Sequence, residues 1–96
     1  MAYVEWTPEA LAHMRERHGV MQEEADDAIA DPNALCISPD PSSRSGMSDR
    51  WIGWSHSRAE VLVVIVVRRG ENRFGANAWT ANRAHRERYW RGDRDE

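Results

Sequence analysis

One segment near the middle of the chain limits the possible folds more than any other. Residues 60–69 read Glu-Val-Leu-Val-Val-Ile-Val-Val-Arg-Arg, with seven consecutive apolar residues, six of them β-branched. Because β-branched side chains favour extended backbone, this segment is predicted to be a strand. A half-exposed strand alternates apolar and polar residues, and this one does not. We therefore expect other elements to cover both of its faces.

Two helices are predicted before this strand. Thr7 is a good N-cap and Pro8 suits the first helical position, so the first helix should begin there. Gly19 is placed to end that helix as a left-handed residue. A second helix is expected over residues 22–30, because the Asp-Pro pair that ends at Pro32 cannot continue it.

The rest of the chain is predicted to form strands and one last helix. The four strands are expected at residues 34–38, 49–56, 60–69 and 73–78. Short connections join the last three strands, which favours an antiparallel meander. The final helix should cover about residues 83–91, with Thr80 or Asn82 as its cap.

These elements predict an α+β fold: two N-terminal helices, a four-stranded antiparallel sheet and a C-terminal helix. A chain of 96 residues has room for one hydrophobic core, so residues 1–96 are expected to form a single domain. The Ser/Pro/Gly-rich loop at about residues 39–48 is expected to be flexible, and residues 92–96 to form a frayed tail.

The charges are distributed unevenly along the chain. The formal net charge is −3, but residues 1–50 hold ten acidic residues and four Arg, whereas residues 51–96 hold nine Arg and six acidic residues. All thirteen basic residues are Arg, which binds phosphate and carboxylate through a planar fork of donors. A codon bias of a GC-rich genome would also explain the absence of Lys. If the protein binds RNA, the C-terminal half should hold the surface.

Several classes of protein are disfavoured. The single cysteine, Cys36, cannot form an internal disulfide, which fits a reducing compartment. The first residues lack the basic and apolar regions of an export signal, so we expect a cytoplasmic protein without a membrane segment. His13 and His18 are five residues apart and face different sides of a helix, so no metal spacing is present. We expect neither a metal nor another cofactor.

The remaining candidates for chemistry are His and Arg residues of the second half. Metal-free RNA cleavage needs a base for the 2′-hydroxyl, cations for the phosphorane and an acid for the leaving oxygen. His56 or His85 could supply the acid or base, and Arg50 and Arg73 the phosphate contacts. Further candidate contacts to RNA are Arg68, Arg69, Trp79, Arg83 and Arg86. Two roles are open for Trp79: it could stack a base, or it could help Trp90 to seal the last helix onto the sheet.

Six short stretches of the chain, taken in their order and spacing, resemble the sequence of a known protein family. They are Val4-Glu5-Trp6-Thr7-Pro8-Glu9, His18-Gly19-Val20 with Glu23-Glu24-Ala25, Asp31-Pro32, Arg50-Trp51-Ile52-Gly53-Trp54-Ser55, Val61-Leu62-Val63-Val64 and Arg86-Glu87-Arg88-Tyr89. Their order and spacing resemble those of the BrnT family, the ribonuclease half of a bacterial type II toxin–antitoxin pair. The resemblance covers about residues 3–90. Arg50 and Arg73 keep family-like positions, whereas Trp79 stands where family members usually carry Arg.

This resemblance implies a RelE-like fold and a metal-independent endoribonuclease that inhibits translation. It also implies a neighbouring ribbon-helix-helix antitoxin of BrnA type, and a toxin–antitoxin heterotetramer that represses its own promoter. A homodimer of the free chain is a further possibility. The alternative hypothesis keeps the fold but not the reaction: a non-catalytic interaction module that binds a partner protein.

Overall fold

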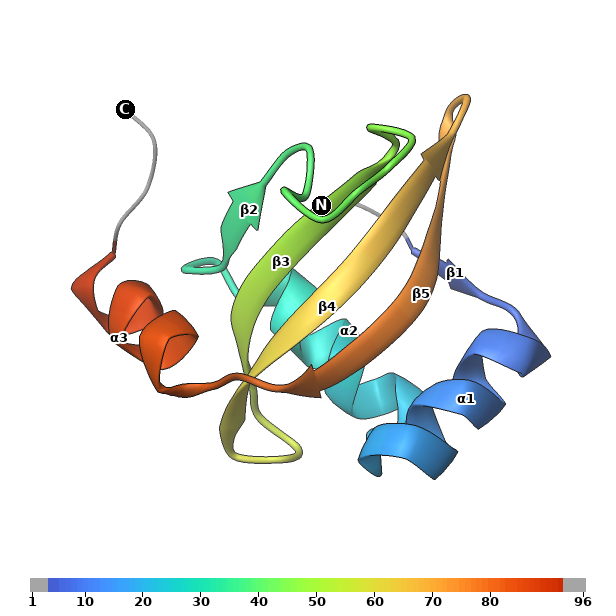
Figure 1. Cartoon of the computed structure of the whole chain (residues 1–96). Coiled ribbons are helices and arrows are strands. Elements are labelled where there is room, and N and C mark those ends of the chain that lie inside the picture. Colours follow the sequence, from blue (N-terminus) through green and yellow to red (C-terminus); the bar gives the residue numbers. More distant parts are fainter. Residues whose placement is uncertain (1–3, 93–96) are drawn as a thin grey trace.

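The computed structural model describes residues 4–92, which form three helices and a five-stranded sheet (Figure 1). Along the chain the elements are β1 (Glu5–Trp6), α1 (Pro8–His18), α2 (Gln22–Ala30), β2 (Leu35–Ile37), β3 (Ser48–Ser55), β4 (Glu60–Arg69), β5 (Asn72–Thr80) and α3 (Arg83–Arg91). The predicted α+β class is therefore confirmed. The C-terminal part of the predicted frayed tail, residues 93–96, lies outside the described residues.

The sequence predicted a sheet of four antiparallel strands, but the sheet has five strands. The sheet order is β1-β5-β4-β3-β2, and β2 to β5 pair antiparallel as expected. The additional strand, β1, pairs parallel with β5, with Glu5 opposite Phe74 and Trp6 opposite Gly75. Two residues are too few to produce an alternating pattern in a sequence. This strand therefore exists because β5 offers it a free edge.

The helix ends follow from local hydrogen bonds, as the sequence indicated. Thr7 Oγ1 accepts from the backbone N–H of Ala10, and Gly19 adopts the left-handed conformation with φ of 67°. At the start of α3, Asn82 Oδ1 accepts from the backbone N–H of His85 at 2.8 Å. Of the two candidate caps, Asn82 is therefore the one used. The predicted limits of the three helices agree with the structure.

Both faces of β4 are covered, as its unbroken apolar sequence predicted. Leu62, Val64 and Val66 pack with α1 and α2, on what we call the α1–α2 face. Val61 and Val63 pack with residues of β2, β3 and α3, on what we call the α3 face. In Figure 1, α2 crosses behind the sheet, α1 lies at the lower right and α3 lies at the left. The central strand is thus the common core of two layers.

The prediction that Trp90 seals α3 onto the sheet was wrong. Trp90 is 65% exposed, and its ring centroid lies 5.9 Å from that of Trp54. The preceding residue, Tyr89, is only 6% exposed and belongs to the core of the α3 face. Neighbouring helix positions point about 100° apart, so only one of the two aromatic residues can face the sheet.

Two glycines allow elements to approach the sheet closely. A Cβ on Gly75 would lie 2.4 Å from two ring atoms of Trp6, and one on Gly53 would lie 2.0 Å from the carbonyl oxygen of Ala28. The indole of Trp6 also donates to Asp26 of α2 at 2.7 Å. Gly75 thus provides the space in which Trp6 links β1 to the helices.

Within residues 4–92, no helix is long and apolar enough to cross a membrane.

Candidate functional site

Two of the predicted catalytic residues meet on the α3 face. Nη1 of Arg50, on β3, lies 3.3 Å from Nε2 of His85, on α3. Arg50 shares this face with Ile52, because residues two positions apart in a strand point the same way. His85 lies one turn before Tyr89, which anchors the helix to the same face. The fold thus joins two residues that are 35 positions apart.

A buried carboxylate holds Arg50 from the other side. Asp40 Oδ1 lies 3.0 Å from Arg50 Nη2, and the exposed fractions of the two side chains are 6% and 17%. The backbone N–H of Asp40 donates to the carbonyl of Ser48 at 2.7 Å, which fixes this part of the loop beside β3. Sequence reasoning missed Asp40, since a Ser/Pro-rich loop carries no periodicity that would indicate which side chain turns inward.

The contact between Arg50 and His85 determines the protonation state of the imidazole. A guanidinium has only donors, so Nε2 of His85 must accept and Nδ1 must carry the ring proton. Burial lowers the pKa of His85, and the positive charges of Arg50 and Arg88 lower it further, whereas Asp40 acts in the opposite direction. His85 is therefore a neutral imidazole at pH 7, held beside a cation.

Two donors of this pair are unused. Arg50 Nε and His85 Nδ1 are both buried, and neither has a hydrogen-bond partner within the described part of the chain. A buried donor without a partner costs about 1–3 kcal/mol. An anion or an oxygen acceptor that reached these atoms would recover that free energy. The pair therefore has the chemistry of an anion-binding site with a basic nitrogen beside it.

Arg73, the second predicted phosphate contact, lies on the opposite face. Arg73 pairs with Arg68, and Arg68 Nε donates to Asp49 Oδ2 at 3.0 Å. Asp49 and Arg50 are consecutive in β3, so their side chains point to opposite faces. The reason is a register shift: Ile65 pairs with Asn77 but the next residue pairs with Gly75. The skipped residue moves Arg73 from the α3 face to the α1–α2 face.

His56, the other predicted acid or base, lies in the turn between β3 and β4. Its neighbour Ser57 donates to Asp27 of α2 through both its backbone N–H and its hydroxyl, at 2.8 and 2.6 Å. These bonds hold the turn against the α2 side of the sheet. The structure therefore brings Arg50 and His85 together, but not His56 or Arg73.

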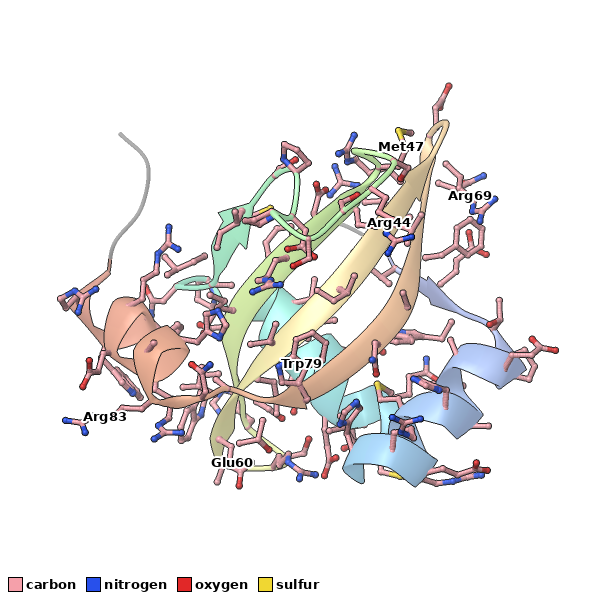
Figure 2. The ribbon with its side chains drawn as sticks, viewed as in Figure 1. Arg44, Met47, Glu60, Arg69, Trp79 and Arg83 are labelled. Atoms are coloured by element: carbon pink, nitrogen blue, oxygen red, sulfur yellow. The ribbon has the colours of Figure 1, made fainter. Side chains whose placement is uncertain are left out.

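The predicted backbone contacts are spread over the molecule. Figure 2 shows Arg69 at the β4–β5 end and Arg83 at the beginning of α3, on opposite sides of the view. Arg83 forms an exposed ion pair with Glu87, and Arg86 Nη1 donates to the carbonyl of Ala81 at 2.7 Å. Arg68 is engaged by Asp49 on the α1–α2 face. These residues do not form one basic surface.

Trp79 forms a pocket with residues that sequence reasoning missed. The pocket has a volume of about 690 Å³ and lies between the end of α1 and β5. It is lined by Arg17, His18, Asn77, Trp79 and Thr80. His18 was considered in the sequence only as a possible metal ligand and was set aside. No sequence signal could have found the pocket, because the contact of α1 with β5 depends on the packing of the whole sheet.

No metal site accompanies these residues. Among the residues that the structure describes, no group of three or more His, Cys, Asp or Glu side chains could hold a metal ion.

No protein-family model matches this chain, and no curated protein matches it. The resemblance to the BrnT family thus rests on the ordered stretches of the sequence.

Proposed function

We propose that this chain is a BrnT-like toxin, a metal-independent endoribonuclease that inhibits translation, and that Arg50 and His85 are its catalytic pair. The observation that carries the proposal is the 3.3 Å contact between a neutral imidazole and a guanidinium, each with a buried donor that has no partner among residues 4–92. The reaction class comes from the sequence resemblance. The geometry supports a smaller catalytic set than the four residues expected from the sequence.

Arg50 would bind the scissile phosphate. Guanidinium groups bind phosphate oxygens through paired, charge-assisted hydrogen bonds. Arg50 Nε has no hydrogen-bond partner within the described residues, and an anionic phosphate is a stronger acceptor than the neutral Nε2 of His85. When the guanidinium turns to the phosphate, the lone pair on His85 Nε2 is released. Substrate binding would thus activate the base.

His85 would then transfer the proton. Its Nε2 removes the proton of the 2′-hydroxyl, O2′ attacks phosphorus, and the bond from phosphorus to O5′ breaks. The imidazolium that forms returns the proton to O5′, so the products are a 2′,3′-cyclic phosphate and a 5′-hydroxyl. Arg50 stabilises the negative charge of the phosphorane. A lowered pKa suits the first step, because His85 enters the reaction unprotonated.

The partner and location follow from the same proposal. A ribbon-helix-helix antitoxin of BrnA type would neutralise the toxin in the bacterial cytoplasm, and the two chains would form a heterotetramer. Co-expression with the neighbouring gene tests this part separately, because rescue of growth requires a specific antitoxin.

Induced expression in a bacterial host tests the catalytic pair. We expect wild type to arrest growth and cleave RNA, and Arg50→Ala and His85→Ala each to lose at least 100-fold in cleavage rate, of the order observed for general acid–base groups. Arg73→Ala is the matched control, since it removes an Arg from the other face and should remain toxic. Loss of activity in Arg73→Ala alone, or full activity in both pair variants, would overturn the assignment.

A non-catalytic interaction module remains the second candidate function. One observation favours it: Trp90 is 65% exposed beside Trp54, and large exposed aromatic groups are common at protein interfaces. In that case wild type would cause neither growth arrest nor RNA cleavage. Trp90→Ser would then reduce binding of the ribbon-helix-helix partner in a pull-down, whereas His85→Ala would not.

A further inference from the structure

The pocket beside Trp79 lies next to the Arg50–His85 pair. Asn77 on β5 pairs with Ile65 on β4, and Ile65 pairs with Arg50 on β3. The three residues form one row across the α3 face. Since neighbouring strands lie about 4.8 Å apart, the Cα atoms of Asn77 and Arg50 are separated by about 10 Å. One short oligonucleotide could therefore reach both places.

Two of the residues that line the pocket carry rings. The imidazole of His18 and the indole of Trp79 have centroids 5.9 Å apart, and their planes are inclined by 46°. His18 is the last residue of α1 and Trp79 lies on β5, so the two rings belong to different elements of the fold. Figure 2 shows the side chain of Trp79 in front of the sheet, close to the C-terminal end of β5. The two rings are already in contact, so a flat ligand would stack on the accessible part of the Trp79 indole, beside His18.

The polar groups of the pocket are suited to the edge of such a ligand. Asn77 Oδ1 accepts from the backbone N–H of Ala78 at 2.9 Å, which leaves its NH2 group to donate. Thr80 Oγ1 donates to Glu60 at 2.9 Å, which leaves its lone pairs to accept. Arg17 adds a positive charge to the lining. The pocket thus combines a stacking surface, one donor, one acceptor and one cation.

We propose that this pocket is a nucleobase subsite, in which an unpaired base of single-stranded RNA stacks on Trp79 beside His18 while Arg17 contacts an adjacent phosphate. A nucleotide is the ligand that uses all of these groups together, because it joins a flat ring with polar edges to an anion. The inference rests on the proposed function in one respect, namely that the ligand is RNA. It assigns a role to Arg17 and His18, which the cleavage mechanism does not use.

Titration of the isotope-labelled full chain with nucleotides tests the subsite directly. The indole N–H signal of Trp79 is identified in a ¹H–¹⁵N spectrum by its loss in Trp79→Leu. We expect this signal to shift saturably with one or more of the four ribonucleoside monophosphates, and ribose 5-phosphate, which has no base, to leave it unchanged. Removal of His18 in His18→Ala should weaken nucleotide binding about tenfold, within the range for loss of one stacking contact.

Trp90→Phe is the matched control, because it changes an exposed indole on α3 without touching the pocket. It should bind nucleotides as wild type does. His18→Ala alters an exposed side chain at a helix end, so its fold can be verified by an unchanged spectrum outside the pocket. If the Trp79 signal does not shift with any of the four nucleotides, or shifts equally with ribose 5-phosphate, the subsite proposal is wrong.

The outcome for this pocket can be separated from the outcome for the nuclease. If wild type cleaves no RNA but the Trp79 signal responds to nucleotides, the subsite stands and only the catalytic proposal fails. If wild type cleaves RNA and Trp79→Leu leaves both kcat and KM unchanged, the catalytic proposal stands and the subsite fails. A KM raised about tenfold at unchanged kcat is the result expected when both are right.

Discussion

Arg50 and His85 share a hydrogen bond at 3.3 Å, although the free forms of both side chains are basic. The contact is possible only while His85 is neutral, because a protonated imidazole would present a donor to a donor. Burial and the charges of Arg50 and Arg88 accordingly hold the pKa of His85 below its ordinary value of about 6.5. The same contact that prepares a base at neutral pH also makes the fold sensitive to acid.

Replacement of Arg50 by Met should raise the pKa of His85. The change removes a cation next to the imidazole and keeps an apolar side chain of similar length. The pKa should move towards the value of an exposed histidine, measured from the Cε1–H signal in a ¹H NMR titration. Arg73→Met, on the opposite face, serves as the control and should leave that titration curve in place. A curve for His85 that is identical in wild type and Arg50→Met would contradict the electrostatic origin of the shift.

The free energy of unfolding should fall as the pH drops below about 6.5. The pKa of His85 is lower in the folded state than in the unfolded state, so the unfolded chain binds the proton more readily. The full contribution of neutral His85 to stability is present above the pKa that this residue has in the unfolded chain. It is lost as the pH falls through the pKa of His85 in the folded protein. Urea unfolding at pH 7.5 and pH 5.5 measures this loss. His85→Gln, which cannot titrate, should show a smaller difference, and an equal difference would refute the link.

Tyr89→Phe should destabilise the fold at pH 7 and much less in acid. The Tyr89 hydroxyl donates to Asp31, and a hydrogen bond to a charged group contributes about 1.5–3 kcal/mol. Burial raises the pKa of Asp31, but the bonds from Tyr89 and from the backbone of Trp54 and Asn33 outweigh it, so the pKa lies below 3.8. This stabilisation is present above pH 3.8 and is lost as the pH falls through the folded pKa. Urea unfolding at pH 7 and pH 2.5 compares the two states.

Gly75→Ala should cost about 1–3 kcal/mol of stability, the usual range for overpacking a core. The added Cβ would occupy space held by the ring of Trp6, and β1 would have to leave the edge of β5. Thermal or urea unfolding gives the change in stability, and the exposure of Trp6 gives a red shift in fluorescence. Gly70→Asn is the matched control, since its φ of +61° suits Asn and no atom of the described residues lies within 4 Å of a Cβ added there. Equal stability of Gly75→Ala and wild type would show that Trp6 can move aside.

The site could be predicted from the sequence only in part. Arg50 and His85 were among the candidates because their side chains have the right chemistry, and they do meet. Arg73 was grouped with them for its charge and its family-like position, and an uninterrupted β5 would have put it on the α3 face. One residue skipped between the partners of Ile65 and Val66 reverses that face. Bulges of this kind depend on how two strands pair, and β5 alone gives no sign of one.

What the sequence by itself determined is local. The β-branched run of β4, the caps at Thr7 and Asn82 and the left-handed Gly19 act over a few neighbouring residues, so the helices and the central strand could be predicted. The tertiary structure alone decided the rest: the parallel pairing of β1, the face of Arg73, the ion pair of Asp40 with Arg50, and the pocket between His18 and Trp79. These contacts join residues distant in the chain, and their geometry exists only after the sheet and its two helical layers have packed.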